Sequence, residues 1–215
     1  MSIETVVATC VAQIDAAHGS REQALTVSRS LVRQCANTIR AAHRAQYTEA
    51  QALLNEAAMI VATLRAAVAD QPLLLGAGYT QDALKEYAEA ALVYAFLTNG
   101  QLPTPEALGV EPAAYLNGLC EAASELRRAI LDRLRRDELE ASEHLLTIMD
   151  DVYSLLITVD YPDAVTGGLR RATDALRAVL ERTRGDLTTA LRQDRLMHAL
   201  AKVEQQLDDD TASST

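Results

Sequence analysis

Residues 20–71 have the sequence SREQALTVSRSLVRQCANTIRAAHRAQYTEAQALLNEAAMIVATLRAAVADQ, which contains no glycine or proline. Apolar side chains recur in it at intervals of three and four residues, as at Leu31 and Cys35 and again at Leu64 and Val68. Because an α-helix turns once every 3.6 residues, such intervals place the apolar side chains on one helical face. The stretch therefore predicts amphipathic helices and a fold that buries their apolar faces.

Two capping-box patterns divide this part of the chain. Thr48 is followed three residues later by Gln51, a combination that favours a helix start and so predicts a break near Tyr47. The same pattern at residues 20–23 comes directly after Gly19. We therefore predict that a first helix ends at Gly19 and that a second begins at residue 20.

The rest of the chain alternates between helical periodicity and short loop signals. The predicted elements are a helix from Thr80 to Asn99-Gly100, a short turn from Thr104-Pro105, and helices over about 112–136, 138–158 and 163–191, the last kinked at Gly167-Gly168. These elements predict an all-α, single-domain bundle of about seven helices over residues 1–207. Residues 208–215 are acidic and polar, and are expected to form a disordered tail.

Composition supports this fold and limits the function. The 215 residues include 38 Ala, 9 Gly and 5 Pro, and only 4% are aromatic. A β-sandwich or a glycine-rich nucleotide-binding sheet is therefore disfavoured. The formal net charge is −10, from 20 Lys and Arg against 30 Asp and Glu, so the chain has no overall positive field that would attract nucleic acid.

The cysteines and the N-terminal sequence indicate a cytoplasmic protein. Cys10, Cys35 and Cys120 are widely spaced and are expected to be small buried residues in a reducing compartment. The first residues lack the pattern of a signal peptide, and no run of 18 apolar residues occurs. We therefore expect no association with a membrane.

The most informative local motif is an acidic pair on an apolar helix. Glu86 and Glu89 are three residues apart and share one helical face, with Asp82 one turn earlier. A second pair, Glu121 and Glu125, is spaced by four residues on the helix that follows Pro112. Antiparallel packing of the two helices would bring the four carboxylates together.

Four clustered carboxylates would suit a hard divalent cation. Mg²⁺ and Mn²⁺ prefer oxygen ligands, and a carboxylate-bound cation can promote hydrolysis of a phosphodiester. From the spacing alone, a solvated helical face is the more usual interpretation of such glutamate pairs. A di-iron centre is disfavoured because no histidine follows a glutamate by three residues, and the absence of phosphate-binding glycine loops indicates that no organic cofactor binds.

Several short motifs, taken in order, resemble the translin and translin-associated factor X family. The resemblance covers residues 20–191 and rests on Ser28-Arg29-Ser30-Leu31, Thr38-Ile39, His43-Arg44, Glu86-Tyr87-Ala88-Glu89-Ala90, Leu108-Gly109-Val110-Glu111-Pro112, Tyr115-Leu116-Asn117-Gly118-Leu119, Ala123-Ser124-Glu125-Leu126, Asp151-Val152-Tyr153 and Asp160-Tyr161-Pro162. It implies a translin-like helical fold and a closed, barrel-like homo-oligomer, usually an octamer, that binds single-stranded RNA or DNA inside its shell.

The acidic positions are closer to the translin-associated factor X branch, for which the resemblance implies metal-dependent endoribonuclease activity. Glu86, Glu89 and Glu125 match acidic positions of that branch, and Glu121 stands where the family commonly has Asp. The implied role of these four residues is to bind Mg²⁺ or Mn²⁺ and to catalyse cleavage. Whether a glutamate acts as general base or the cation activates water stays open.

Phosphate contacts require Arg or Lys inside such a shell. The candidates are Arg29, Arg40, Arg44, Lys85 and a second group that consists of Arg127, Arg128, Arg133, Arg135 and Arg136. Arginines on long helices also serve as solvated or ion-paired residues. The alternative hypothesis is therefore a non-catalytic RNA- or DNA-binding oligomer whose glutamates form ion pairs at interfaces.

Overall fold

The structure, a computed structural model, describes residues 2–213, and the regular elements of this part of the chain are all helices. They are α1 (Ile3–His43), α2 (Tyr47–Val68), α3 (Pro72–Leu75), α4 (Gly78–Thr98), α5 (Pro105–Leu108), α6 (Pro112–Leu134), α7 (Leu139–Leu156), α8 (Asp163–Thr166) and α9 (Leu169–Ser213). The all-α prediction is confirmed. The described residues form six long helices and three of a single turn, where about seven helices were predicted.

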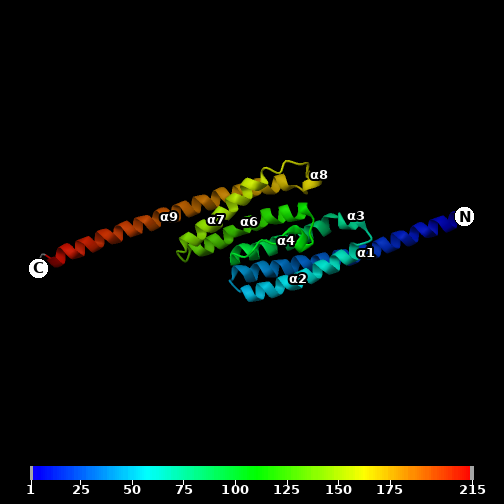
Figure 1. Cartoon of the computed structure of the whole chain (residues 1–215), viewed down its shortest axis with the longest axis horizontal. Helices are drawn as coiled ribbons and strands as arrows, with labels where there is room; N and C mark the ends of the chain where they lie inside the picture. The colour runs from blue at the N-terminus through cyan, green and yellow to red at the C-terminus, as the bar shows by residue number, and fades with distance from the viewer. Residues whose placement is uncertain (1, 214–215) are drawn as a thin grey trace.

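The long helices pack as three layers of two (Figure 1). α1 and α2 form one outer layer, α4 and α6 lie in the middle, and α7 and α9 form the other outer layer. α4 contributes to both parts of the core: Leu84 packs with α1 and α2, whereas Leu92 packs with α6, α7 and α9. Its apolar character on nearly every side follows from this central place.

The N-terminal helix differs from its prediction. α1 continues without interruption through Gly19, where a helix end was expected. A methyl group at Gly19 would meet no atom within 4 Å, and the residue keeps a helical backbone. A glycine inside a helix costs only about 1 kcal/mol relative to alanine, and the helix-forming residues on both sides outweigh that cost.

Several predicted boundaries are confirmed. α2 begins at Tyr47, and α4 ends at Asn99, which adopts the left-handed conformation with a φ of 52°. The Thr104 side chain caps α5 by accepting a hydrogen bond from the backbone N–H of Ala107. Pro112 occupies the first turn of α6, where a missing N–H is tolerated.

Other boundaries need correction. α4 begins at Gly78, so Thr80 lies inside the helix and its hydroxyl donates to the Leu74 carbonyl instead of capping. The kink predicted at Gly167 and Gly168 is a complete break between α8 and α9. Both glycines have positive φ, 63° and 89°, which a continuous helix does not allow.

The two ends of the chain extend beyond opposite ends of the bundle (Figure 1). The first turns of α1 carry exposed apolar side chains such as Ile3, Val7 and Ile14, and they leave Cys10 exposed, although it was expected to be buried. α9 remains helical through Ser213, where a disordered tail from residue 208 was expected. Residues 214–215 of that tail lie outside the described part.

The remaining cysteines and the membrane prediction can be compared with the same structure. Cys35 and Cys120 are buried free thiols, as expected. Within the described residues, no helix has both the length and the apolar content that crossing a bilayer requires.

Candidate metal centre

The two acidic helices, α4 and α6, run parallel, whereas antiparallel packing was predicted. Near the start of both helices the Gln81 amide donates to Glu111 at 3.3 Å, and further along both helices Lys85 donates to Glu121 at 2.7 Å. The segment between α4 and α6, which contains α5, returns the chain to the end at which α4 began (Figure 1). Matched positions of the two helices therefore progress in the same direction.

A glycine sets the close approach of these helices. A methyl group at Gly118 of α6 would lie 2.7 Å from the Lys85 carbonyl oxygen, 2.9 Å from Cβ of Ala88 and 3.0 Å from the Glu89 nitrogen. Only glycine allows the α6 backbone to come this near to α4. Sequence reasoning missed this role, and its one signal was a glycine in the middle of a strongly helical segment.

Three of the four predicted carboxylates come together at this crossing. Glu86 and Glu89 project from α4 and Glu121 from α6, and each offers one carboxylate oxygen within 4.8 Å of the others. All three side chains are partly buried. Spacing within one helix had indicated the first pair, and the helix crossing adds Glu121 to it.

Burial and mutual repulsion make these carboxyls hard to ionise. Burial is the main cause that raises the pKa of Glu89 to about 8, and the charges of Glu86, Glu121 and Glu125 raise it further. The pKa of Glu86 is also raised, chiefly by burial, although Lys85 opposes the change. In the absence of a cation, the cluster therefore retains a proton near neutral pH.

Lys85 belongs to this cluster and is not a free phosphate ligand. Its ammonium lies 2.7 Å from Glu121 and 3.9 Å from Glu86. Burial alone would lower its pKa, but the hydrogen bond and the charge of Glu121, with the charge of Glu86, raise it overall. Lys85 therefore supplies part of the positive charge that the carboxylates require.

Glu125, the fourth predicted carboxylate, is held beside the cluster by a histidine of α1. Nε2 of His43 lies 2.8 Å from Glu125, and the histidine side chain is only 1% exposed. Nδ1 of the same ring is buried and has no hydrogen-bond partner among the described residues. A proton on Nδ1 would be a buried donor without an acceptor, so Nε2 carries the proton that Glu125 accepts.

The basic candidates fall into two groups. Arg29, Arg40 and Arg44 are exposed, and their spacing along α1 places them on one face. Arg128 is also exposed, with its guanidinium 4.0 Å from Glu125.

Of the other arginines in and directly after α6, three make bonds within the chain. Arg127 pairs with Asp186 at 2.8 Å, Arg133 donates to the Ala141 carbonyl and Arg136 pairs with Glu138. Arg135 is exposed.

The donor set fits a small divalent cation. Mg²⁺ binds oxygen at about 2.1 Å, so neighbouring ligands around it lie about 3 Å apart and opposite ligands about 4.2 Å apart. The three carboxylate oxygens lie within 4.8 Å of one another, so they would move closer together to bind one ion. Carboxylates that repel one another are also the ligands that gain most from a bound cation.

No protein-family profile matches the chain. An uncharacterized protein of Methanocaldococcus jannaschii, MJ0175, is 31% identical over 186 residues, which span 86% of this chain and 82% of that protein.

Solved structures of C3PO proteins, which are translin and TRAX proteins, share the fold. AfC3PO in complex with duplex RNA is 29% identical with a TM-score of 0.79, and a second AfC3PO structure is 28% identical with a TM-score of 0.80. Each match covers 88% of this chain and 98% of AfC3PO. Apo-NeC3PO, at 17% identity and a TM-score of 0.78 over 88% of this chain and 99% of that protein, supports the fold alone. By its likeness to these C3PO structures, the chain belongs to the translin and translin-associated factor X (TRAX) family.

Proposed function

We propose that this protein is a metal-dependent endoribonuclease that acts on single-stranded RNA within a homo-oligomeric shell. The observation that carries the proposal is the convergence of Glu86, Glu89 and Glu121 from two helices, with oxygens within 4.8 Å of one another. Like charges that are partly buried at such a distance favour cation binding. By the sequence resemblance, Glu86 and Glu89 stand at acidic positions of the catalytic branch, and Glu121 stands where the family commonly has Asp.

Glu86, Glu89 and Glu121 would hold Mg²⁺ or Mn²⁺, and Glu125 would complete the acidic surface beside them. A divalent cation bound there polarises a phosphodiester and lowers the pKa of water. His43 keeps Glu125 in place through the hydrogen bond from Nε2.

The exposed arginines supply the expected contacts to the RNA backbone. Arg29 and Arg40 of α1, with Arg44 directly after the helix, form an exposed basic stripe. Arg128 extends this positive surface next to Glu125. AfC3PO has been solved with duplex RNA, which supports RNA as the partner here. Arginine contacts to phosphate are independent of sequence, so we expect weak base preference from this stripe.

The proposed assembly is a closed homo-octamer in the cytoplasm. Exposed apolar side chains at both projecting ends, such as Ile14 on α1 and Leu200 on α9, support contacts with further copies. An enclosed site also reconciles RNA binding with a net charge of −10, because the sign of each face then matters more than the sum. Free thiols at Cys35 and Cys120 are compatible with a reducing compartment.

A second candidate is an RNA-binding oligomer that does not cleave. The hydrogen bond from Lys85 to Glu121, at 2.7 Å, favours it, because an ammonium can take the place of a cation. A single Lys85 does not balance Glu86, Glu89 and Glu121 together, and Glu89 keeps a strongly raised pKa in its presence. We therefore favour the catalytic proposal.

An RNA cleavage assay separates the two candidates. A labelled single-stranded RNA is incubated with the purified oligomer in Mg²⁺, in Mn²⁺ or in EDTA, and the products are resolved by length. Internal cleavage with either cation and none in EDTA supports the endoribonuclease. Binding without cleavage under every condition would establish the non-catalytic candidate instead.

A further inference from the structure

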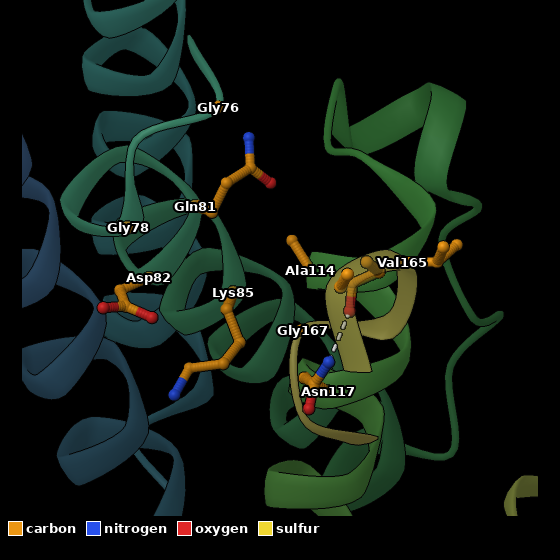
Figure 2. Close-up of a pocket in the computed structure, with 11 residues that line it drawn as sticks. Gly76, Gly78, Gln81, Asp82, Lys85, Ala114, Asn117, Val165 and Gly167 are labelled. Atoms are coloured by element: carbon orange, nitrogen blue, oxygen red, sulfur yellow. Dashed lines mark hydrogen bonds between the residues drawn. The ribbon is translucent and has the colours of Figure 1, made fainter. Parts of the chain in front are cut away.

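A cavity of about 400 Å³ lies directly beside the carboxylate cluster. It opens between the first turns of α4 and α6 and the α8 segment, and small residues such as Gly78 and Ala114 form much of its wall (Figure 2). Asp82 and Lys85 also line it, and Lys85 reaches Glu121 of the cluster. A strand whose phosphate lies at the cluster would therefore pass the mouth of the cavity.

The side-chain carboxamides of Gln81 and Asn117 line the cavity, and their hydrogen bonds fix how each amide is oriented. The Gln81 nitrogen donates to the Leu75 carbonyl at 2.8 Å and to Glu111 at 3.3 Å. Both partners only accept hydrogen bonds, so the amide cannot be reversed and its carbonyl oxygen is the group left to accept. Figure 2 shows this side chain reaching from α4 into the space between α4 and α6.

Asn117, on the opposite wall, is oriented in the same way. Its nitrogen donates to the carbonyls of Ala113, at 2.8 Å, and of Thr166, at 2.7 Å, so its carbonyl oxygen is also the remaining acceptor. Figure 2 shows Lys85 turned away from Gln81. Gln81 and Asn117 therefore line opposite walls of the cavity, and the carbonyl oxygen is the atom of each amide that is left to accept a hydrogen bond.

We propose that this cavity is a nucleobase-binding subsite that takes the base next to the phosphodiester at the carboxylate cluster. Every RNA base carries at least one N–H group, which can donate to the Gln81 or the Asn117 oxygen. The cavity volume lies in the range of about 300–1,000 Å³ that is usual for small-molecule sites. The inference rests on the proposed RNA substrate, and it adds a contact that holds one base in place.

The test is a set of short single-stranded RNAs in which one nucleotide after another is made abasic. Binding is measured by fluorescence anisotropy, in EDTA and in Ca²⁺, to wild type and to Gly78→Leu. A Cβ atom at Gly78 meets no atom within 4 Å, so we chose this position on the cavity wall to introduce the bulkier leucine. We expect one abasic position to weaken wild-type binding about tenfold, the effect of losing roughly one good contact. The Gly78→Leu variant should show no loss at that position.

Gly19→Leu is the matched control, because Gly19 is an exposed helical glycine with the same open surroundings far from the cavity. It should behave as wild type. Gln81→Met is a second variant of similar size that removes the acceptor without filling the space. In this variant the abasic nucleotide should weaken RNA binding less than it does in wild type. The test therefore remains informative if Gly78→Leu fails to fold.

Each outcome decides between the inference and the proposed function. If no abasic position weakens RNA binding, or if the same position weakens it equally in wild type and in Gly78→Leu, the subsite is overturned. The nuclease proposal then stays intact. Absence of RNA binding by wild type overturns both. The abasic effect without cleavage in Mg²⁺ supports the subsite and contradicts the nuclease.

Discussion

Gly118 of α6 lies so close to Lys85 of α4 that a methyl group on the glycine would come within 2.7 Å of the lysine carbonyl oxygen. This contact joins two parallel helices, and it places Glu121 opposite Glu86 and Glu89. The candidate metal centre therefore depends on Gly118, which offers no side-chain ligand and acts only by letting the two helices pack closely.

We expect Gly118→Ala to destabilise the protein by about 1–3 kcal/mol, the usual effect of overpacking a core. The nearest obstacles are backbone atoms of α4, which cannot move aside without shifting the helix. Gly19→Ala is the control: it adds a methyl group in open space and should stabilise α1 by up to about 1 kcal/mol. Urea denaturation measures the free energy of unfolding of both variants. A Gly118→Ala variant as stable as wild type would show that α4 and α6 leave room for a methyl group at this position.

Glu89 makes the stability of the metal-free protein depend on pH. Its pKa is about 8 in the folded chain against an ordinary value of 4.5, so the folded state binds more protons between these two values. The free energy of unfolding should therefore fall as pH rises through this window. Denaturation in EDTA should show this fall for wild type and a smaller one for Glu89→Gln, which cannot ionise. Parallel pH profiles for the two proteins would contradict the raised pKa.

The ammonium of Lys85 neutralises part of the carboxylate charge that a divalent cation would otherwise neutralise. Because its ammonium lies 2.7 Å from Glu121, replacement by methionine should leave the carboxylates more dependent on added Mg²⁺. We expect Mg²⁺ to raise the melting temperature of Lys85→Met more than that of wild type. The control is Lys202→Met, on the exposed end of α9, which should respond as wild type does. An equal response in all three proteins would argue against cation binding at the cluster.

His43 is expected to act as a positioning residue for Glu125. His43→Phe removes the 2.8 Å hydrogen bond that holds Glu125 beside the cluster, and it should reduce Mg²⁺-dependent RNA cleavage by about tenfold, the lower end of the effect of losing a group that orients a metal site. His43→Gln retains a donor and should recover part of the rate. The Mg²⁺ concentration at half-maximal cleavage should rise in His43→Phe, which a change confined to stability would not produce. Unaltered cation dependence would assign the histidine to packing alone.

The sequence predicted those features that depend on local periodicity. Glu86 and Glu89 share a face because they are one turn apart on one helix, and Asn99 ends α4 because it tolerates the left-handed conformation. Gly19 misled the boundary prediction, because one glycine is too weak a signal to end a helix when its neighbours favour one.

Features that depend on tertiary packing could not be predicted from the sequence. The bond between His43 and Glu125 joins residues 82 positions apart, and no periodicity connects them. The parallel direction of α4 and α6 depends on the path of the connecting segment, which spacing within either helix does not encode. Lys85 was grouped with the phosphate ligands for its charge, but its partner Glu121 comes from another helix.

The most direct test of the central claim compares RNA cleavage by wild type and by the double variant Glu86→Ala/Glu89→Ala, at equal oligomer concentration and in saturating Mg²⁺. Size-exclusion chromatography and RNA binding are measured on the same preparations, so that loss of cleavage is not confused with loss of assembly. We predict internal cleavage by wild type that EDTA abolishes, and no detectable cleavage by the double variant, which keeps its oligomeric size. Undiminished cleavage by the double variant would contradict the assignment of the carboxylate cluster as the catalytic metal centre.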